Sequence, residues 1–237
     1  MAERIIELEK SIIVAADVEV DKLDNLILAT STVEGIGGYK IGLVLALTNG
    51  LPQTVERIRK TTDLPIIYDH QKAGNDIPAM GDKFVKVCKD SGVDAVILFP
   101  FGGIVTEVAW IHACQDQGLG VLVGAHMTQQ GFLESEGGSV ADNAPDRIFT
   151  LAANEGVRDF VVPGNKIEFV EHYKKLLDDL LGESTFSLYA PGFITQGGEV
   201  SGFALAAGGR WHAIVGSAIY EAKNIRVTTL QMAKAVR

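Results

Sequence analysis

One short stretch of this sequence gathers acidic and basic side chains closely enough for chemistry. The segment YDHQKAGNDIP contains Asp69, Lys72 and Asp76, and Lys40 lies in the apolar run YKIG that precedes it. Opposite charges held together keep one another ionised, and a carboxylate entering such a cluster would meet an acidic wall. The cluster is therefore suited to expelling carbon dioxide. The alternative is a solvated network of surface charges, which is the usual fate of a charge cluster seen in isolation.

Two glycine-rich segments further along the chain are suited to holding a phosphate. APGFITQGGE contains Pro191, Gln196 and Gly197, and AIVGSAIY contains Gly216 and Ser217. Backbone N–H groups in such turns and at helix N-termini bind anions, and the Gln196 amide can donate to a phosphate oxygen. The simpler alternative is that these glycines only make tight turns. The presence of both segments favours a phosphate site.

The elements that must position these residues are short apolar runs rich in β-branched residues. Such runs are typical of parallel strands covered on both faces. Eight are expected, at residues 12–16, 38–41, 65–68, 95–99, 121–125, 160–162, 186–189 and 213–215. Several end in a polar or turn-forming residue, including Asp17, Lys40, Asp69 and His126.

Amphipathic segments with helical spacing separate these runs. They cover residues 51–60, 77–91, 106–117, 145–155, 166–181 and 226–236. In the second of them, Met80, Phe84, Val87 and Cys88 indicate one buried stripe. The alternation predicts a single α/β domain over residues 1–237, a (β/α)₈ TIM barrel, with a doubly wound sheet as the competing fold. In a barrel the strand ends converge on one mouth, where active sites are built.

Composition limits the partners and the compartment. The net charge of −9 argues against nucleic acid as a partner, because a basic face would be needed to neutralise phosphates. No run is long and apolar enough for a membrane span, and the N-terminus lacks the apolar core of a signal peptide, so a cytoplasmic protein is expected. Cys88 and Cys114 are expected to fill core space. No spacing of His, Cys or carboxylate residues resembles a dedicated metal site.

Six segments together carry a family resemblance that spans nearly the whole chain. They are AADV, YKIG, YDHQKAGNDIP, GAHMT, APGFITQGGE and HAIVGSAIYEA. In order and spacing they resemble the orotidine 5′-monophosphate decarboxylase suprafamily, which also contains 3-keto-L-gulonate 6-phosphate decarboxylase and hexulose-6-phosphate synthase. The resemblance implies cofactor-free decarboxylation of a nucleotide substrate, orotidine 5′-monophosphate, to uridine 5′-monophosphate in pyrimidine biosynthesis.

The resemblance also implies roles for individual residues. Asp17 would contact the ribose hydroxyls, Lys40 and Asp69 would orient the substrate, and Lys72 would protonate the carbon that loses carbon dioxide. Asp76 would complete the array from the neighbouring subunit, which implies a homodimer with shared active sites.

The remaining implied roles concern substrate binding. Thr128 matches the hydroxyl residue that contacts the pyrimidine ring, and Gln196 matches the glutamine that grips the phosphate. Pro191, Gly197, Gly216 and Ser217 lie in the two segments expected to surround that phosphate.

Three departures from the family pattern fall on these contacts. The family usually has Asp-x-Lys-x-x-Asp, whereas Lys72 follows Asp69 by three residues and Asp76 follows Lys72 by four. Gly216 is followed by Ser217 instead of the phosphate-gripping arginine, which removes charge-assisted hydrogen bonds of about 1.5–3 kcal/mol. Ala79 replaces a threonine after the Asp-Ile-Pro element, and Arg210 is expected at the opposite end of its strand.

Two other functions remain open from the sequence. One is a magnesium-dependent phosphosugar lyase of the same suprafamily, for which Glu136 is a weak ligand candidate. The other is a barrel that binds a nucleotide without turning it over, which the loss of the arginine at Ser217 would permit. His70 and His126 are assigned no catalytic role.

Overall fold

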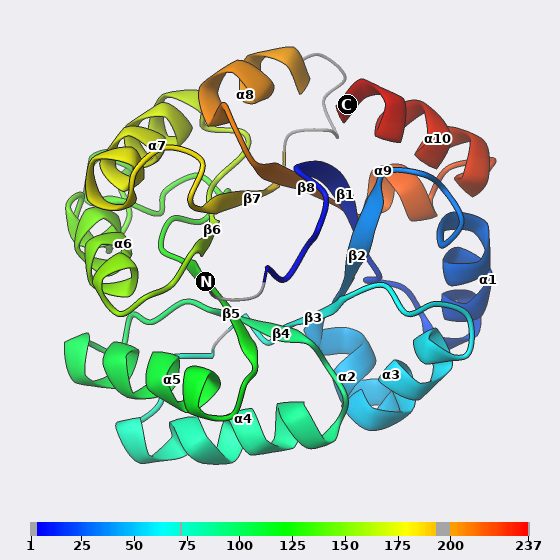
Figure 1. The fold of residues 1–237 in the computed structure, drawn as a ribbon, viewed down its shortest axis with the longest axis horizontal. Coiled ribbons are helices and arrows are strands. Elements are labelled where there is room, and N and C mark those ends of the chain that lie inside the picture. The colour runs from blue at the N-terminus through cyan, green and yellow to red at the C-terminus, as the bar shows by residue number, and fades with distance from the viewer. Residues whose placement is uncertain (1–3, 72, 193–199, 237) are drawn as a thin grey trace.

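Eight parallel strands close into a barrel with helices around the outside (Figure 1). The computed structural model describes residues 4–71, 73–192 and 200–236. Each strand pairs with its neighbours in chain order, and β8 returns to pair with β1. The predicted (β/α)₈ barrel is confirmed, because a doubly wound sheet would leave two open edges.

The predicted strands all exist, with ends shifted by no more than two residues. The observed bounds are β1 Lys10–Ala15, β2 Ile36–Ile41, β3 Ile66–Asp69, β4 Ala95–Leu98, β5 Gly120–Gly124, β6 Asp159–Val161, β7 Ser187–Pro191 and β8 Trp211–Val215. Short apolar runs therefore located the strands because both faces of each strand are covered.

Six helical segments also match the expected ones. These are α3 Leu51–Arg59, η1 Pro78–Met80 with α4 Gly81–Asp90, α5 Ile104–Asp116, α6 Ala144–Asn154, α7 Ile167–Leu181 and α10 Ile225–Val236. The described residues also form α1 Val20–Thr30, α2 Leu43–Asn49, η2 Glu134–Glu136, α8 Val200–Ala207 and α9 Ser217–Tyr220, which the sequence analysis did not assign. Most of these are too short for helical spacing to repeat.

The prediction of a buried stripe on α4 is wrong for one residue, Val87. Val87 is 62% exposed, whereas Gly81, Val85 and Cys88 are buried and Phe84 is half-buried. The buried residues Gly81, Val85 and Cys88 are positions one, five and eight of α4, so they share the face that packs against the barrel. Val87 is one residue before Cys88, and one residue turns a helix by about 100°, so its side chain points to solvent.

Alternation along the strands divides the core into two layers and decides which residues enter the barrel. On β2, Tyr39 and Ile41 pack under the helices, so Lys40 between them points into the barrel. On β3, Ile66 and Tyr68 pack outward in the same way, which sends Asp69 inward. Two oppositely charged side chains therefore enter the barrel from adjacent strands.

The amino-terminal segment closes the barrel at the amino ends of the strands. Ile6 is 2% exposed and packs inside the barrel with Ile13, Ile67 and Leu122. The guanidinium of Arg210 donates to the carbonyl oxygens of residues 6, 7 and 8 at 3.0, 3.3 and 2.9 Å. Arg210 thus lies at the end of β8 away from the strand carboxyl ends, as its position in the sequence predicted. The segment lies across the ring in Figure 1.

Cys88 and Cys114 are both buried and both carry free thiols, as expected for residues that fill space between helices and strands. Among the helices of the described ranges, we find none with the length and apolar character needed to cross a membrane.

A buried carboxyl group on α5 makes stability depend on pH. Glu107 is 2% exposed, and its Oε1 atom has no hydrogen-bond partner among the described residues. Burial, with a smaller contribution from Glu155, raises the pKa of Glu107 to about 8. Between pH 4.5 and 8 the folded protein therefore keeps a proton that the unfolded chain releases, so stability must fall as pH rises through that window.

We expect Glu107→Gln to abolish this loss, because the amide keeps the shape and cannot ionise. The variant should gain on the order of 3 kcal/mol over the unaltered protein between pH 5 and pH 8, measured by urea denaturation. The exposed Glu171→Gln on α7 serves as a control with no expected gain. Stability curves that stay parallel for Glu107→Gln and the unaltered protein would contradict this account.

Candidate active site

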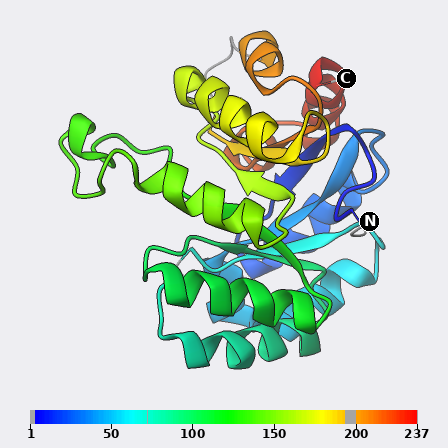
Figure 2. The same cartoon turned by 60° about the vertical axis from the view of Figure 1, so that its left-hand side comes forward.

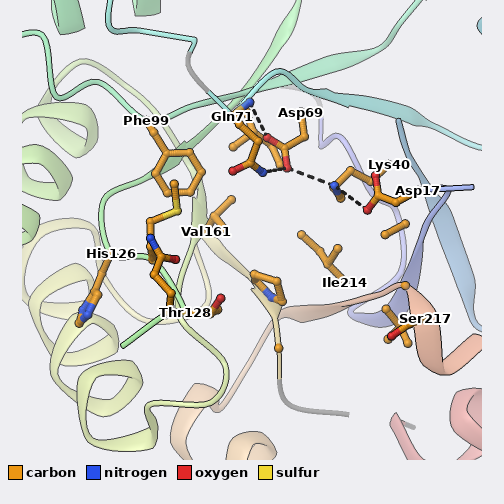
Figure 3. A pocket seen from close by; sticks show the side chains of 18 of the residues that line it. Asp17, Lys40, Asp69, Gln71, Phe99, His126, Thr128, Val161, Ile214 and Ser217 are labelled. Carbon is orange, nitrogen blue, oxygen red and sulfur yellow. Dashed lines mark hydrogen bonds and ion pairs between the residues drawn. The ribbon is translucent and has the colours of Figure 1, made fainter. Parts of the chain in front are cut away.

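A cavity of about 320 Å³ opens at the carboxyl ends of the strands. Its polar lining includes Asp17, Lys40, Asp69, Gln71, Thr128 and Ser217, and its apolar floor includes Ile97, Val161 and Ile214. Figure 3 shows the acidic and basic groups on one side of the cavity, with Thr128 and Ser217 on the other. The predicted convergence of strand-end residues on one mouth is therefore observed.

Lys40 links two carboxylates across the first three strands. Its Nζ atom lies 3.2 Å from Asp69 Oδ2 and 3.4 Å from Asp17 Oδ2. Burial alone would favour the neutral amine, but the carboxylates of Asp69 and Asp17 outweigh it and hold the pKa of Lys40 above its ordinary value. Lys40 is 8% exposed, so this ammonium is a fixed charge inside the barrel.

Asp69 receives hydrogen bonds from Gln71 as well as from Lys40. Gln71 Nε2 donates to Asp69 Oδ2 at 2.7 Å, and the Gln71 backbone N–H donates to Oδ1 at 3.1 Å. These contacts fold the chain tightly after β3, and Gln71 has a φ of 65°, in the left-handed region. With only 4% of Asp69 exposed, its carboxylate is held in one orientation by three donors.

Asp17 is the open end of this chain of charges. Its side chain is 40% exposed, and it follows β1 where the barrel opens. The neighbouring Gly42 makes room for it, since a Cβ atom at residue 42 would lie 2.0 Å from Asp17 Oδ1. Asp17 thus combines contact with Lys40 and an oxygen facing the cavity, an arrangement suited to accepting hydrogen bonds from ligand hydroxyl groups.

The opposite side of the cavity contains the residues expected to bind the substrate. Thr128, Pro191, Gly216 and Ser217 all line it. Gly192 follows Pro191 with a φ of 97°, and a Cβ atom there would approach Thr128 Cγ2 to 3.1 Å. Among the described residues that line the cavity, Lys40 is the only lysine or arginine, and Ser217 contributes a hydroxyl group.

Four predicted site residues are not placed in this cavity. Lys72, Gln196 and Gly197 lie outside the described residues, so their predicted roles stay predictions. Asp76 is exposed and lies away from the cavity, in a surface groove that also contains Met80. Its Oδ1 atom accepts a hydrogen bond from the next backbone N–H at 2.7 Å. The expected grouping of Asp76 with Asp69 therefore does not occur within one copy of the chain.

Several lining residues were missed by sequence reasoning. Gln71 sits inside the segment that was singled out, and its position two residues after an inward-facing Asp69 was a usable signal. Tyr220 lines the cavity from α9, and burial with the nearby charge of Asp17 raises its pKa. Phe99 and Met127 follow strand ends but are apolar, so nothing distinguished them from core residues.

The two histidines at strand ends take structural positions. The His126 ring turns away from the cavity in Figure 3, and its Nδ1 atom lies 2.8 Å from the hydroxyl of Tyr173. His70 Nδ1 lies 2.6 Å from the hydroxyl of Tyr68, and its ring packs against Phe84. Within the described residues, no group of three or more His, Cys, Asp or Glu side chains is clustered to hold a metal ion.

The fold and this cavity define a class: (β/α)₈ barrel proteins in which a lysine links two carboxylates at the strand carboxyl ends. The sequence profile of the orotidine 5′-phosphate decarboxylase / HUMPS family matches residues 10–232. The chain belongs to this family, and the resemblance inferred from the six sequence segments is confirmed.

Individual relatives agree over nearly the full length. Orotidine 5′-phosphate decarboxylase from Methanosarcina mazei is 28% identical over 225 residues, covering 95% of this chain and 94% of that protein. The protein of the same name from Methanosphaera stadtmanae is 26% identical, covering 97% and 98%.

Solved structures show the same fold. Orotidine 5′-monophosphate decarboxylase from Methanocaldococcus jannaschii, complexed with the inhibitor BMP, superposes with a TM-score of 0.81 at 21% identity, covering 96% of this chain and 98% of that one. The Pyrococcus horikoshii enzyme gives 0.79 at 22% identity, covering 95% and 99%. These identities indicate a divergent sequence on a shared barrel.

Replacing Lys40 tests whether the ammonium keeps the carboxylates in place. We expect Lys40→Met to lower the free energy of unfolding at pH 7 by about 3 kcal/mol, because the buried Asp69 loses its counter-charge. The double variant Lys40→Met with Asp69→Asn should recover part of the loss. Lys22→Met, which breaks only an exposed pair with Glu19, is the control, with an expected loss below about 1 kcal/mol. Equal losses for Lys40→Met and Lys22→Met in chemical denaturation would rule out this role.

Proposed function

We propose that this protein decarboxylates orotidine 5′-monophosphate to uridine 5′-monophosphate, without a cofactor, as a step of pyrimidine biosynthesis. The observation that carries the proposal is the Asp17–Lys40–Asp69 chain, with Lys40 and Asp69 buried and Asp17 open to the cavity, in a barrel that belongs to the decarboxylase family. The relatives named above are decarboxylases, which makes the expected reaction the cleavage of a carbon–carbon bond.

The geometry of Asp69 supports this chemistry. Three donors hold its carboxylate, so it cannot move away when a substrate carboxylate is bound beside it. Repulsion between the two carboxylates is relieved as the carbon–carbon bond breaks and neutral carbon dioxide leaves. An interaction that is less unfavourable in the transition state than in the bound substrate accelerates the reaction. The electron pair stays on C6 of the pyrimidine ring.

A proton must then reach C6, and we assign this step to Lys72 by its place in the family pattern. The ammonium of Lys72 would donate the proton, and its positive charge would stabilise the carbanion before the transfer. Lys40 cannot readily take this role, because its ammonium already donates to two carboxylates and has a raised pKa. Lys40 is therefore assigned to orienting Asp69 and Asp17.

The rest of the cavity is assigned to holding the nucleotide. Asp17 accepts hydrogen bonds from the ribose hydroxyls, and Thr128 faces the pyrimidine ring. Pro191, Gly216 and Ser217 surround the phosphate together with Gln196 and Gly197. Since Ser217 supplies a hydroxyl and no positive charge, we expect weaker phosphate binding than in relatives that carry an arginine at this place.

We further propose that two copies of the chain form a homodimer with shared active sites, acting in the cytoplasm as a single barrel domain over residues 1–237. Asp76 is exposed beside Ile77, which is 62% exposed, so an acidic group and an apolar group protrude together from the loop after β3. Burying them against a second copy would remove the apolar side chain from water, and the family pattern assigns Asp76 to the partner's cavity.

An assay on the purified protein tests the reaction. Loss of orotidylate absorbance should be seen with the unaltered protein, and Lys72→Ala should lower kcat by about 10²-fold or more, because the proton donor is gone. Lys86→Ala, on the exposed face of α4, is the matched control and should keep full activity.

Other outcomes of that assay point elsewhere. Tight binding of uridine 5′-monophosphate without turnover would indicate a nucleotide-binding barrel. Turnover of a sugar phosphate that stops when a chelator is added would indicate a magnesium-dependent lyase. Either result rejects the proposed decarboxylation of orotidylate.

Mixing two inactive variants tests the shared site. Lys72→Ala and Asp76→Asn place their defects in the same cavity of a mixed dimer, which leaves the other cavity intact. Random exchange of equal amounts should therefore restore about a quarter of the unaltered activity. If each variant is inactive alone and the mixture stays inactive after verified subunit exchange, Asp76 does not act across an interface.

A further inference from the structure

The segment between β5 and α6, residues 125–143, carries Thr128 to the cavity and then leaves the barrel. It contains η2 and protrudes from the body of the molecule in green in Figure 2. We call it the β5–α6 loop. A long excursion of this kind needs anchors if Thr128, near its start, is to keep one position. The structure contains such anchors, and the proposed reaction leaves them unexplained.

The first anchor is Lys166, the residue just before α7. Its Nζ atom lies 2.5 Å from Glu136 Oε1 and 2.9 Å from His126 Nε2. An ammonium group can only donate, so His126 Nε2 accepts and the imidazole is neutral with its proton on Nδ1. That proton is then donated to the hydroxyl of Tyr173 at 2.8 Å. Burial, and then the charge of Lys166, lower the pKa of His126 to about 4.

Glu136 connects Lys166 to the internal fold of the loop. Its other oxygen, Oε2, accepts the backbone N–H groups of Phe132 and Leu133 at 3.0 and 3.3 Å. The hydrogen bond from Lys166 is the largest of the causes that lower the pKa of Glu136 to about 2, so the group is anionic at any ordinary pH. The ring of Phe132 stacks on His126 with centroids 5.4 Å apart. The loop is thus folded around one carboxylate that Lys166 holds.

The second anchor is Asn165, which precedes Lys166 in the chain. Its Nδ2 atom donates to the backbone carbonyl of Thr128 at 3.0 Å. Two consecutive residues after β6 therefore hold both the part of the β5–α6 loop at the cavity and the part that protrudes. Most ion pairs on the surface contribute little to stability. The Lys166 and Glu136 side chains are only 13% and 22% exposed and His126 is fully buried, so this pair is better shielded from water than a surface pair.

We propose that Asn165, by its hydrogen bond to Thr128, and Lys166, through Glu136 and His126, are positioning residues that hold Thr128 at the edge of the cavity and so set the affinity for the base of the nucleotide. This inference rests on the proposed function, because it takes the Thr128 side chain to face the substrate ring. Neither Asn165 nor Lys166 lines the cavity, so both act through the loop and not by touching the ligand.

Steady-state kinetics and calorimetry on the full-length protein test this. Lys166→Met and Glu136→Gln should each raise KM for orotidylate and Kd for uridine 5′-monophosphate at least about fivefold, because Thr128 no longer holds the ring in place. The value of kcat should change less than about threefold, because the Asp17–Lys40–Asp69 chain is untouched. Lys166→Arg, which can still donate to Glu136, should recover much of the affinity. Lys175→Met, on the exposed face of α7 and paired with Asp179, should leave all three constants unchanged.

A melting curve for each variant separates positioning from general stability. If Lys166→Met lowers the melting temperature but leaves KM and Kd unchanged in a folded, active protein, the proposal is overturned. Equal increases in KM for Lys166→Met and Lys175→Met would also overturn it. Failure of the proposed function appears differently, as absence of turnover and of nucleotide binding in the unaltered protein.

Discussion

The structure depends on placing Asp69 and Lys40 together where water has little access. Either charge buried alone would carry a desolvation cost of several kcal/mol, so the two groups are stable in the barrel only as a pair. The pair exists because β2 and β3 are adjacent and in a register that puts residues 40 and 69 on their inner faces. Asp17 and Gln71 then complete the set of partners, one toward solvent and one toward the buried carboxylate.

Much of the cavity is held by contacts between neighbouring barrel units. Asp17 and Lys40 join the first two units, and Lys40 and Asp69 join the second and third. Phe99 lies over Gly124, where a Cβ atom would come within 2.4 Å of its ring. Asn165 in turn holds Thr128. Because each contact spans two units, the shape of the cavity depends on closure of the barrel and not on any single loop.

The sequence predicted the strands well because the barrel covers them on both faces, and uninterrupted apolar runs are the direct result. It predicted Lys40, Asp69 and Asp17 as a group because they lie at the ends of such runs, and the carboxyl ends of barrel strands converge on one mouth. It could not predict that Val87 points to solvent, because spacing alone does not decide which of two adjacent stripes of α4 packs against the barrel. Nor could it predict that Lys166 contacts His126 and Glu136. These residues precede Lys166 in the chain by 40 and 30 positions, and no local pattern connects them.

Helix α1 shows a different limit. Leu23, Leu26, Ile27 and Thr30 have helical spacing and are all buried, so its pattern was available in the sequence. By contrast, α9 has four residues and shows no periodicity at all. The rules of spacing work for elements that pack along their length, and they fail for single turns that exist because a strand has ended beside them.

Ile6 and Arg210 close the barrel at the amino ends of the strands, and this affects how ligands reach and leave the cavity. The described part of the amino-terminal segment fills that end, and the described residues leave the cavity open at the carboxyl ends of the strands. Within the part of the chain that the structure describes, this is the opening through which a ligand enters and leaves. Carbon dioxide released deep in the cavity would pass the nucleotide from which it came. The shape of the cavity would therefore set the order in which the two products leave.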